Sequence, residues 1–385
     1  MDVDAPVAPP EYDPFRASVR AFVAEHAPPR PEQRKAGMRT PEDAGEVAAL
    51  QQWLGLLHRA GYSPLELAAG TDPWPARVAI EEIEAAGAPW RIGNPLVETA
   101  LTEHGTADQQ QRFLSRLRAG EDIWCQLYSE PDAGSDLASL TTRAVRDGDR
   151  YVVNGQKVWT TWAQWSDYGY LLARTDPAAD KHAGITAFAI DMRQPGVEVR
   201  PLREMTGTSD FNEVFFTDAV VSVADRIGEE GQGWAIASRS LMSERSRQGS
   251  GDRDMCEQVK DLVALGTPGL VDTAGLVRLY ERAHVLRLLE HTMASRAALQ
   301  QETPADAPVL KTWFSTLNLD VAEEALRLLG SRSVLVEGDA GTEANGRWQD
   351  MWLYARGYTI SAGSNEVMRN LIAERALGMP RDRAR

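Results

Sequence analysis

Three consecutive segments of different character predict an α+β fold with a helical domain, a β domain and a second helical domain. Up to about residue 120, apolar residues recur three and four positions apart, as on one face of a helix. Between residues 127 and 221 short β-rich runs alternate with turn residues, and no stretch favours a long helix. From Gly233 onward long amphipathic stretches return, as in a helical bundle. We therefore expect domains at residues 1–122, 123–226 and 227–385.

Helical periodicity justifies the first domain. In the first helix Phe15, Val19 and Phe22 share a face, and the Pro28–Pro29 pair stops it after His26. Four further stretches follow the same spacing: EVAALQQWLGLLHRAG, ARVAIEEIEAAG, NPLVETALTEHG and ADQQQRFLSRLRAG.

The β domain is predicted from short runs rich in β-branched and aromatic residues. In YVVNGQKVWTTW, at 151–162, Asn154-Gly155 separates two such runs and predicts a hairpin turn. The other predicted strands are YGYLLART, GITAFAIDM, GVEVRPL and NEVFFTDAVV.

The C-terminal domain is predicted from long helical stretches. They are WAIASRSLMSER, TAGLVRLYERAHVLRLLEHTMASRAALQ and APVLKTWFSTLNLDVAEEALRLLG. A last amphipathic helix is expected near the C-terminus, with Val367, Leu371, Ile372 and Ala376 on one face.

Composition excludes several classes of protein. The net charge of −15 argues against nucleic acid or an anionic membrane as the main partner. Two cysteines, Cys125 and Cys256, are too few for a disulfide framework or a cysteine-rich metal site, so we expect no metal. The acidic, proline-rich start lacks the features of a signal peptide, and no apolar run could span a bilayer. We expect a cytoplasmic protein without a membrane partner.

Four stretches together resemble the acyl-CoA dehydrogenase family. They are YSEPDAGSDLASLTTRA at 128–144, YVVNGQKVWTTW, IGEEGQGWAIASRSLMSER at 227–245, and ISAGSNEVMRNLIAERALGMPR at 360–381. The resemblance implies a helical domain, a β domain and a four-helix bundle. It also implies FAD, an acyl-CoA substrate dehydrogenated between its α- and β-carbons, and an electron-transfer flavoprotein as electron acceptor.

The resemblance places the first group of flavin residues in the EPDAGSD loop. Gly134 allows close backbone approach, and the donors of Gly134 and Ser135 suit a phosphate or a ring oxygen. Ser129 corresponds to a hydroxyl near the pyrimidine end of the flavin, and Gln126, Leu127 and Tyr128 would add backbone contacts. The simpler alternative is a serine-capped turn between two elements.

A second group of flavin residues lies in the strand motif and near the C-terminus. Trp159 would pack across the isoalloxazine ring and Thr161 would bond to N5, since residues two apart in a strand face the same side. The alternative is a tryptophan in the β core. Ser364 and Glu366 match positions near the FAD adenine, although a helix N-cap with a charged first turn would look the same.

The catalytic base is the main departure from familiar family members. Many carry a glutamate just before the glycine of the C-terminal loop, where this chain has Ala362. Other members carry it on the first bundle helix, followed by arginine, and Glu244-Arg245 occupy those positions. The stripe Trp234, Ala237, Leu241 continues at helical spacing onto that pair. An exposed ion pair at a helix end is the alternative.

The same resemblance suggests the substrate contacts. Glu244 is the candidate base, and Arg245 would face the CoA end of the substrate. Ala362, through its backbone N–H, and Gly363 would lie at the thioester, and Ser135 is a further candidate. The small side chains of 361–363 favour a bulky or branched acyl group.

A missing motif bears on assembly. Homotetrameric members carry Arg-x-x-Phe-Gly in the bundle, which reaches a neighbour's FAD diphosphate; here only Arg253 lies in that region. The chain lacks this motif and contains the phrase FNEVFF at 211–216, and in both respects it resembles the steroid side-chain-degrading branch, which pairs two different chains. We expect a homo- or heterotetramer. Two alternatives stay open: a non-catalytic subunit that completes a partner's FAD site, and a flavin oxidase or monooxygenase on the same fold.

Overall fold

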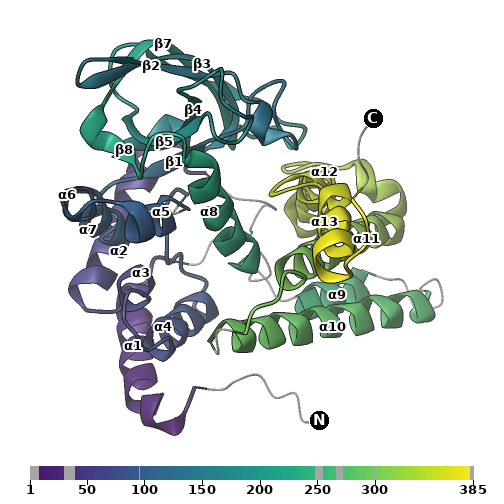
Figure 1. Cartoon of the computed structure of the whole chain (residues 1–385). Coiled ribbons are helices and arrows are strands. Elements are labelled where there is room, and N and C mark those ends of the chain that lie inside the picture. The colour runs from purple at the N-terminus through teal and green to yellow at the C-terminus, as the bar shows by residue number, and fades with distance from the viewer. Residues whose placement is uncertain are drawn as a thin grey trace. The chain divides into compact units, whose positions relative to one another are not determined.

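The computed structural model describes residues 8–29, 40–94, 96–247, 255–265, 272–298 and 301–381; the side chains of 242–247, 294, 295, 297 and 298 lie outside that description. The chain divides into two compact units, one comprising 8–29 and 40–243, the other extending from residue 244. Figure 1 shows the helices and strands of both units. Helices, then strands, then helices follow one another, which confirms the predicted α+β order.

The first unit begins with helices whose apolar faces make one core. Val19 and Val23 of the first helix are buried with Trp53 and Ile83, as the periodicity predicts. Asp43 caps the second helix by accepting hydrogen bonds from the N–H groups of the first turn. The helices are α1 (Asp13–His26), α2 (Ala44–Arg59), α3 (Pro64–Leu67), α4 (Trp74–Ala85), α5 (Leu96–His104), α6 (Ala107–Gln109) and α7 (Ser115–Arg118), with a π turn at Gln110–Leu114 between α6 and α7.

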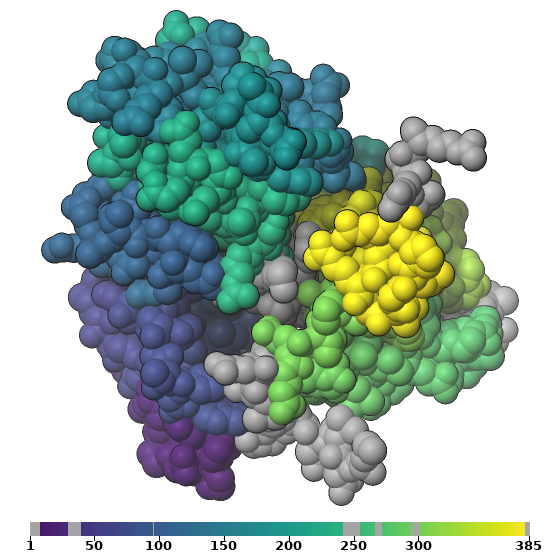
Figure 2. Space-filling view, in the orientation of Figure 1, coloured from purple at the N-terminus to yellow at the C-terminus, as the bar shows by residue number. Residues whose placement is uncertain are grey.

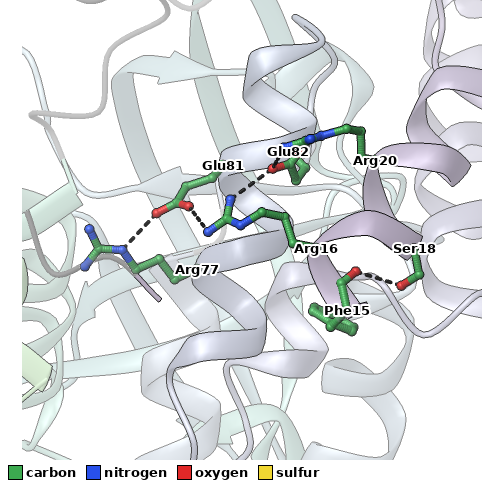
Figure 3. A network of polar contacts seen from close by, with 7 residues as sticks. All are labelled: Phe15, Arg16, Ser18, Arg20, Arg77, Glu81 and Glu82. Atoms are coloured by element: carbon green, nitrogen blue, oxygen red, sulfur yellow. Dashed lines mark hydrogen bonds and ion pairs between the residues drawn. The ribbon is translucent and has the colours of Figure 1, made fainter. Parts of the chain in front are cut away.

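Ion pairs join α1 to α4 beside that core (Figure 3). Arg16 reaches Glu81 at 2.8 Å and Glu82 at 2.9 Å, and Arg20 reaches Glu82 at 2.7 Å. Arg77 holds the other oxygen of Glu81 at 3.0 Å. The hydrogen bond from Arg20 is the largest influence on the Glu82 carboxyl; with those from Arg16 it outweighs burial and lowers the pKa of Glu82. The two helices are therefore fixed by charge as well as by apolar contact.

A twisted sheet of eight strands follows these helices in the first unit. The strands are β1 (Trp124–Leu127), β2 (Arg143–Asp147), β3 (Arg150–Thr161), β4 (Tyr168–Arg174), β5 (Ile185–Asp191), β6 (Val197–Leu202), β7 (Phe211–Ser222) and β8 (Arg226–Ile227). Their order is β6-β7-β3-β2-β4-β5-β8, with β1 pairing parallel to β4. The helices of residues 8–118 and the strands make one continuous surface (Figure 2).

Both faces of this sheet are buried at its centre. Trp124 and Tyr170 point to the face covered by α5, the π turn and the start of α8 (Gly233–Arg247). Cys125 and Leu171, the next residues along, belong to a separate core on the opposite face. Ala237 on α8 is buried in the first of these cores, with Trp234 and Leu241 packed beside it. The predicted stripe on α8 is therefore confirmed.

The predicted hairpin turn at Asn154-Gly155 is wrong. β3 runs through both residues, and its register with β7 shifts between Val153 and Gly155. Gly155 has φ 151°, and a Cβ added there would lie 2.5 Å from Oγ1 of Thr142, so a glycine is required by close packing. The turn that joins β2 to β3 is instead Asp147–Arg150, where Gly148 has φ 65°.

The second unit contains α9 (Met255–Leu265), α10 (Thr273–Ala298), α11 (Asp306–Leu329), α12 (Arg347–Ile360) and α13 (Asn365–Leu371), which a π turn at Ile372–Ala376 extends. α11 packs against α9, α10, α12 and α13. Apolar residues of α9–α12, including Leu317 and Trp348, make its core. α10 and α11 confirm two predicted stretches, whereas the predicted patterns include neither α9 nor α12.

The predicted apolar face of the last helix differs from the buried one. Val367, Leu371 and Ile372 are half-buried and Ala376 is exposed. The fully buried apolar side chain of α13 is Met368. Met368 lies beside the predicted stripe, so the buried face of α13 is about one residue out of register with the predicted face.

Both cysteines are buried, Cys125 in the sheet and Cys256 on α9. Burial raises the pKa of the Cys125 thiol to about 12.

Among the helices that the structure describes, none combines the length and the apolar character needed to cross a membrane.

Candidate functional site

Most predicted flavin residues of the first unit lie around one junction, where the EPDAGSD loop meets β3. The N–H of Val158 on β3 donates to the carbonyl of Ser129 at 2.9 Å. Gly134 and Ser135 follow a tight turn closed by Glu130 and Ala133, and both are exposed. The loop therefore presents backbone and hydroxyl donors to solvent beside the end of β3.

A buried ion pair fixes this loop to β3. The ammonium of Lys157 lies 2.8 Å from the Glu130 carboxylate and donates to the Tyr128 carbonyl at 2.9 Å. The same carboxylate accepts from the backbone N–H groups of Thr141 at 2.6 Å and Thr142 at 2.9 Å. The pair thus ties together the start of the loop, its end and the strand.

Burial and mutual attraction shift the pKa values of both members of this pair. Burial favours the neutral Glu130 carboxyl, but the charge and hydrogen bond of Lys157, with those from Thr142 and Thr141, outweigh it and lower the pKa of Glu130 to about 2. Burial lowers the pKa of the Lys157 ammonium to about 8, against the attraction of Glu130. Neither residue is among the predicted site residues, although both are charged positions inside the quoted motifs.

Trp159 stands out at the end of β3. Its side chain is 60% exposed, and its φ is 60°, a left-handed conformation that is rare for an aromatic residue. The register between β3 and β7 shifts between Lys157 and Thr160, which explains the turned backbone. The indole meets Phe211 edge-on, with ring centroids 6.0 Å apart. The predicted alternative, a tryptophan in the β core, does not describe Trp159 in this chain.

Thr161 lies two residues further on and is half-buried, whereas Thr160 between them is fully buried. Trp159 and Thr161 therefore share the more exposed side, although a bulge rather than regular alternation places them. Asn212 on β7 holds this segment, because its amide donates to the Thr160 carbonyl at 3.0 Å and to Gln164 at 2.6 Å. It lies in the FNEVFF phrase.

Two predicted residues point away from this exposed edge. The Tyr128 ring is buried against Tyr170, with centroids 5.2 Å apart. The amide oxygen of Gln126 accepts from Asn94 at 2.9 Å. The Tyr128 side chain is thus part of the core, and backbone contacts of these two positions with a flavin stay a prediction.

In the second unit, four predicted residues lie where the chain passes from α12 into α13: Ala362, Gly363, Ser364 and Glu366. Ala362 has φ 51° and Gly363 has φ 92°, so two successive left-handed residues turn the chain between the helices. Ser364 is the N-cap of α13, with its hydroxyl accepting from the Val367 N–H at 3.4 Å. Glu366 is exposed in the first turn, where hydrogen bonds from its own backbone N–H and from Ser364 lower its pKa. A capped helix is thus present, and a contact with FAD stays a prediction.

The predicted base is Glu244, whose side chain lies outside the part of the chain that the structure describes. Glu244 and Arg245 belong to the last turn of α8, beyond the buried Ala237. Arg253 lies outside the described residues altogether.

An open cavity of about 530 Å³ lies elsewhere in the first unit. It is lined by α2 and by Trp165, Met192 and Val199, among others, and by none of the predicted site residues. The candidate site is therefore the exposed junction of the EPDAGSD loop and β3, not this cavity.

Comparisons with known proteins agree with this arrangement. The N-terminal, middle and C-terminal domains of acyl-CoA dehydrogenase match residues 9–121, 125–219 and 273–377. Acyl-CoA dehydrogenase IpdE1 of Mycobacterium tuberculosis (strain ATCC 25618 / H37Rv) is 35% identical over 400 residues, which cover 97% of this chain and 99% of that protein.

Two solved structures have the same fold. The Tcur3481-Tcur3483 steroid ACAD superposes with a TM-score of 0.81 at 28% identity, covering 99% of this chain and all of that chain (100%). The ChsE4-ChsE5 complex from Mycobacterium tuberculosis superposes with a TM-score of 0.79 at 29% identity, covering 98% and 100%. The chain therefore belongs to the acyl-CoA dehydrogenase family.

Proposed function

We propose that this enzyme is a FAD-dependent dehydrogenase of acyl-CoA thioesters with bulky or branched acyl groups, steroid side chains among them. The observation that supports it best is Trp159, an exposed aromatic residue held in a left-handed conformation beside the EPDAGSD loop. Such strain is kept where the surroundings over-determine it, often at ligand sites. A planar apolar face in water is what a flavin ring would cover.

The residues around Trp159 suit a flavin. Thr161 offers a hydroxyl on the same side, and Gly134 and Ser135 offer donors in the exposed loop for a phosphate or ring oxygen. Ser129, with the backbone of Gln126 and Tyr128, would line the pyrimidine end, and Ser364 and Glu366 the adenine end. FAD, when bound, supplies the acceptor for the hydride that leaves the substrate β-carbon.

Glu244 is the proposed base for the α-proton. Ala362 has no side chain that could take a proton. The α8 stripe that packs into the core continues onto Glu244 and Arg245 at helical spacing. A carboxylate in a dry site has a raised pKa, which makes it an effective base near neutral pH. Arg245 would bind the CoA end of the substrate.

The thioester oxygen gains negative charge as the α-proton leaves. The N–H of Ala362, with Gly363 and the Ser135 hydroxyl as further contacts, is proposed to stabilise it; fixed donors aimed at developing charge are a major source of catalysis. The small side chains of 361–363 leave room for a bulky acyl group, and the solved relatives include one described as a steroid ACAD.

A second acyl-CoA dehydrogenase chain is the proposed partner, with an electron-transfer flavoprotein as acceptor. The sequence lacks Arg-x-x-Phe-Gly, and a similar structure is that of a complex of two named chains, ChsE4 and ChsE5. Co-expression with a candidate partner, followed by size-exclusion chromatography, tests this: separate elution of the two chains would argue against it.

The base is tested by anaerobic flavin bleaching of wild type and Glu244→Gln, each prepared in the form that retains FAD, alone or with its partner chain. The probes are octanoyl-CoA, isovaleryl-CoA and a CoA thioester of a sterol side-chain acid. We expect wild type to bleach, and the variant to retain FAD but bleach roughly a hundredfold more slowly or not at all. Glu257→Gln, which changes an exposed glutamate of α9, should bleach like wild type. Equal rates for wild type and Glu244→Gln would rule out Glu244 as the base.

A further inference from the structure

A buried lysine lies next to the loop that carries Ala362. We propose that Lys311 is a positioning residue: it fixes both flanks of the 361–364 loop and so aims the Ala362 N–H at the substrate. This inference rests on the proposed function for the identity of the ligand, but not for the contacts that fix the loop.

Lys311 lies on α11 and is 1% exposed. Its ammonium donates to the side-chain oxygen of Asn365 at 2.8 Å and to the carbonyl of Thr359 at 3.3 Å. Thr359 is in the last turn of α12 and Asn365 is the first residue of α13. One cation therefore bonds to the chain immediately before the loop and immediately after it.

A second side chain of α11 strengthens the contact after the loop. Ser315 lies one helical turn beyond Lys311, and its hydroxyl donates to the same oxygen of Asn365 at 2.9 Å. Ser315 and Asn365 are both buried. The Asn365 amide thus accepts two hydrogen bonds from one helix, which fixes where α13 begins.

The cation also suits the end of α12. The last carbonyls of a helix lack partners within it and carry partial negative charge. Lys311 bonds to one of them, that of Thr359, while the N–H of Ser361 closes the helix onto the Gly357 carbonyl at 2.8 Å. The end of α12 is thereby set at the residue where the loop begins.

The loop between these anchors has a backbone that needs support. Ala362 is left-handed, a backbone conformation that is unfavourable for an L-residue with a side chain. Such a conformation persists where neighbouring contacts enforce it. Anchors on both sides enforce it here, and they act on the backbone whose N–H is the proposed donor.

Stability alone does not explain a lysine in this position. An apolar residue of similar length would fill the space without the desolvation of a charge, and replacing buried charged groups by apolar ones is often neutral or stabilising. Geometric precision at the loop is what the ammonium adds, because small displacements of a catalytic donor reduce rates strongly.

The test compares Lys311→Met with wild type and with Lys260→Met, which removes an exposed lysine of the same unit that pairs with Glu257. The first measurement is hydrogen exchange of the peptide covering 359–366. We expect exchange in Lys311→Met to be about tenfold faster there and unchanged in the sheet, with no effect of Lys260→Met. Asn365→Ala is a second variant, which removes the acceptor shared by Lys311 and Ser315. It should speed exchange of the same peptide, and it tests the anchor even if Lys311→Met does not fold.

The second measurement is steady-state kinetics with whichever of the three acyl-CoA probes bleaches wild type fastest. A displaced donor lowers kcat roughly tenfold or more and leaves KM within about threefold, because the charge on the thioester oxygen develops in the transition state. In contrast to Asn365→Ala, the variant Asn365→Asp should keep kcat near that of wild type. Its carboxylate still accepts the hydrogen bonds from Lys311 and Ser315.

The outcomes separate this inference from the proposed function. Unchanged exchange of 359–366 in folded Lys311→Met and Asn365→Ala would overturn the anchoring. A loosened loop with unchanged kcat would overturn its role in catalysis. If no acyl-CoA bleaches wild type, the proposed function fails, and the exchange data still decide whether Lys311 fixes the loop.

Discussion

Trp159 illustrates at the residue scale how a site differs from a core. Fully buried aromatic side chains of the first unit, such as Trp124 and Tyr170, lie on regular strands. Trp159 instead lies at a register shift, left-handed and exposed. A residue that fills no core and costs backbone energy contributes little to folding, which supports the proposal that Trp159 contacts the flavin.

Trp159→Ala should therefore separate binding from stability. We expect the free energy of unfolding to change by about 1 kcal/mol or less, as at exposed positions. FAD affinity should fall about tenfold or more, because the planar apolar contact is lost. Equilibrium urea denaturation of the apoprotein and FAD titration by fluorescence measure the two quantities.

Trp165→Ala is the matched control. That indole is half-buried and donates to the Pro41 carbonyl at 3.1 Å, so its removal should cost stability rather than FAD affinity. The reverse pattern, with Trp159→Ala unstable and normal in FAD affinity, would contradict the assignment.

Sequence patterns predicted residue types here better than their geometry. The motif containing Trp159 and Thr161 points to a strand, and both residues lie on it. Their shared side comes from a bulge, which depends on pairing with β7 and on Asn212, more than 50 positions away in the sequence. Local spacing carries no information about such a pairing.

At the scale of elements, the EPDAGSD loop likewise depends on contacts with residues distant in the sequence. Among the contacts that hold it, the buried ammonium of Lys157 bonds to the loop from β3. Asn154-Gly155 is not a hairpin turn for a related reason: Thr142, which the Glu130 carboxylate holds, packs against Gly155, and β3 continues past a register shift there instead of turning. Tertiary contacts override the local turn preference there.

Lys157→Met should release this loop. The substitution leaves the Glu130 carboxylate buried without its cation, which we expect to destabilise the chain by about 3–5 kcal/mol. The measurement is urea denaturation followed by circular dichroism.

Lys181→Met provides the comparison within the same unit. Lys181 pairs with Asp136 at 2.6 Å, but both side chains are exposed, so its loss should cost about 1 kcal/mol or less. Similar losses for the two variants would show that burial of the Lys157 pair adds nothing.

At the scale of the whole molecule, each unit contains a buried lysine that holds a loop of the proposed site. Lys157 is fully buried in the first unit and Lys311 in the second. The order of helices and strands was predictable from periodicity, since it reflects burial on one face. These lysines were not, because a charged residue inside an apolar pattern is recognised only when its partners are known.

Acid should reveal the first of these pairs in the stability of the entire chain. The folded pKa of Glu130, about 2, lies below its ordinary value of 4.5. The unfolded chain therefore binds the proton more readily, and stability from this group, full above about pH 4.5, is lost as the pH falls through about 2. In Glu130→Gln the free energy of unfolding should fall less steeply over that interval. If the free energy of unfolding falls with the same slope in Glu130→Gln and in wild type, the lowered pKa of Glu130 is contradicted.

The two buried thiols also make this chain convenient for spectroscopy. Cys125 and Cys256 are shielded from reagents, and thiolate formation at Cys125 is further suppressed by its raised pKa. A cysteine introduced at exposed Val145 in the sheet, and another at exposed Val336 in the second unit, would be the preferred sites for a dye pair. The native chain thus needs no cysteine removal before energy transfer is used to follow the distance between its units as acyl-CoA is added.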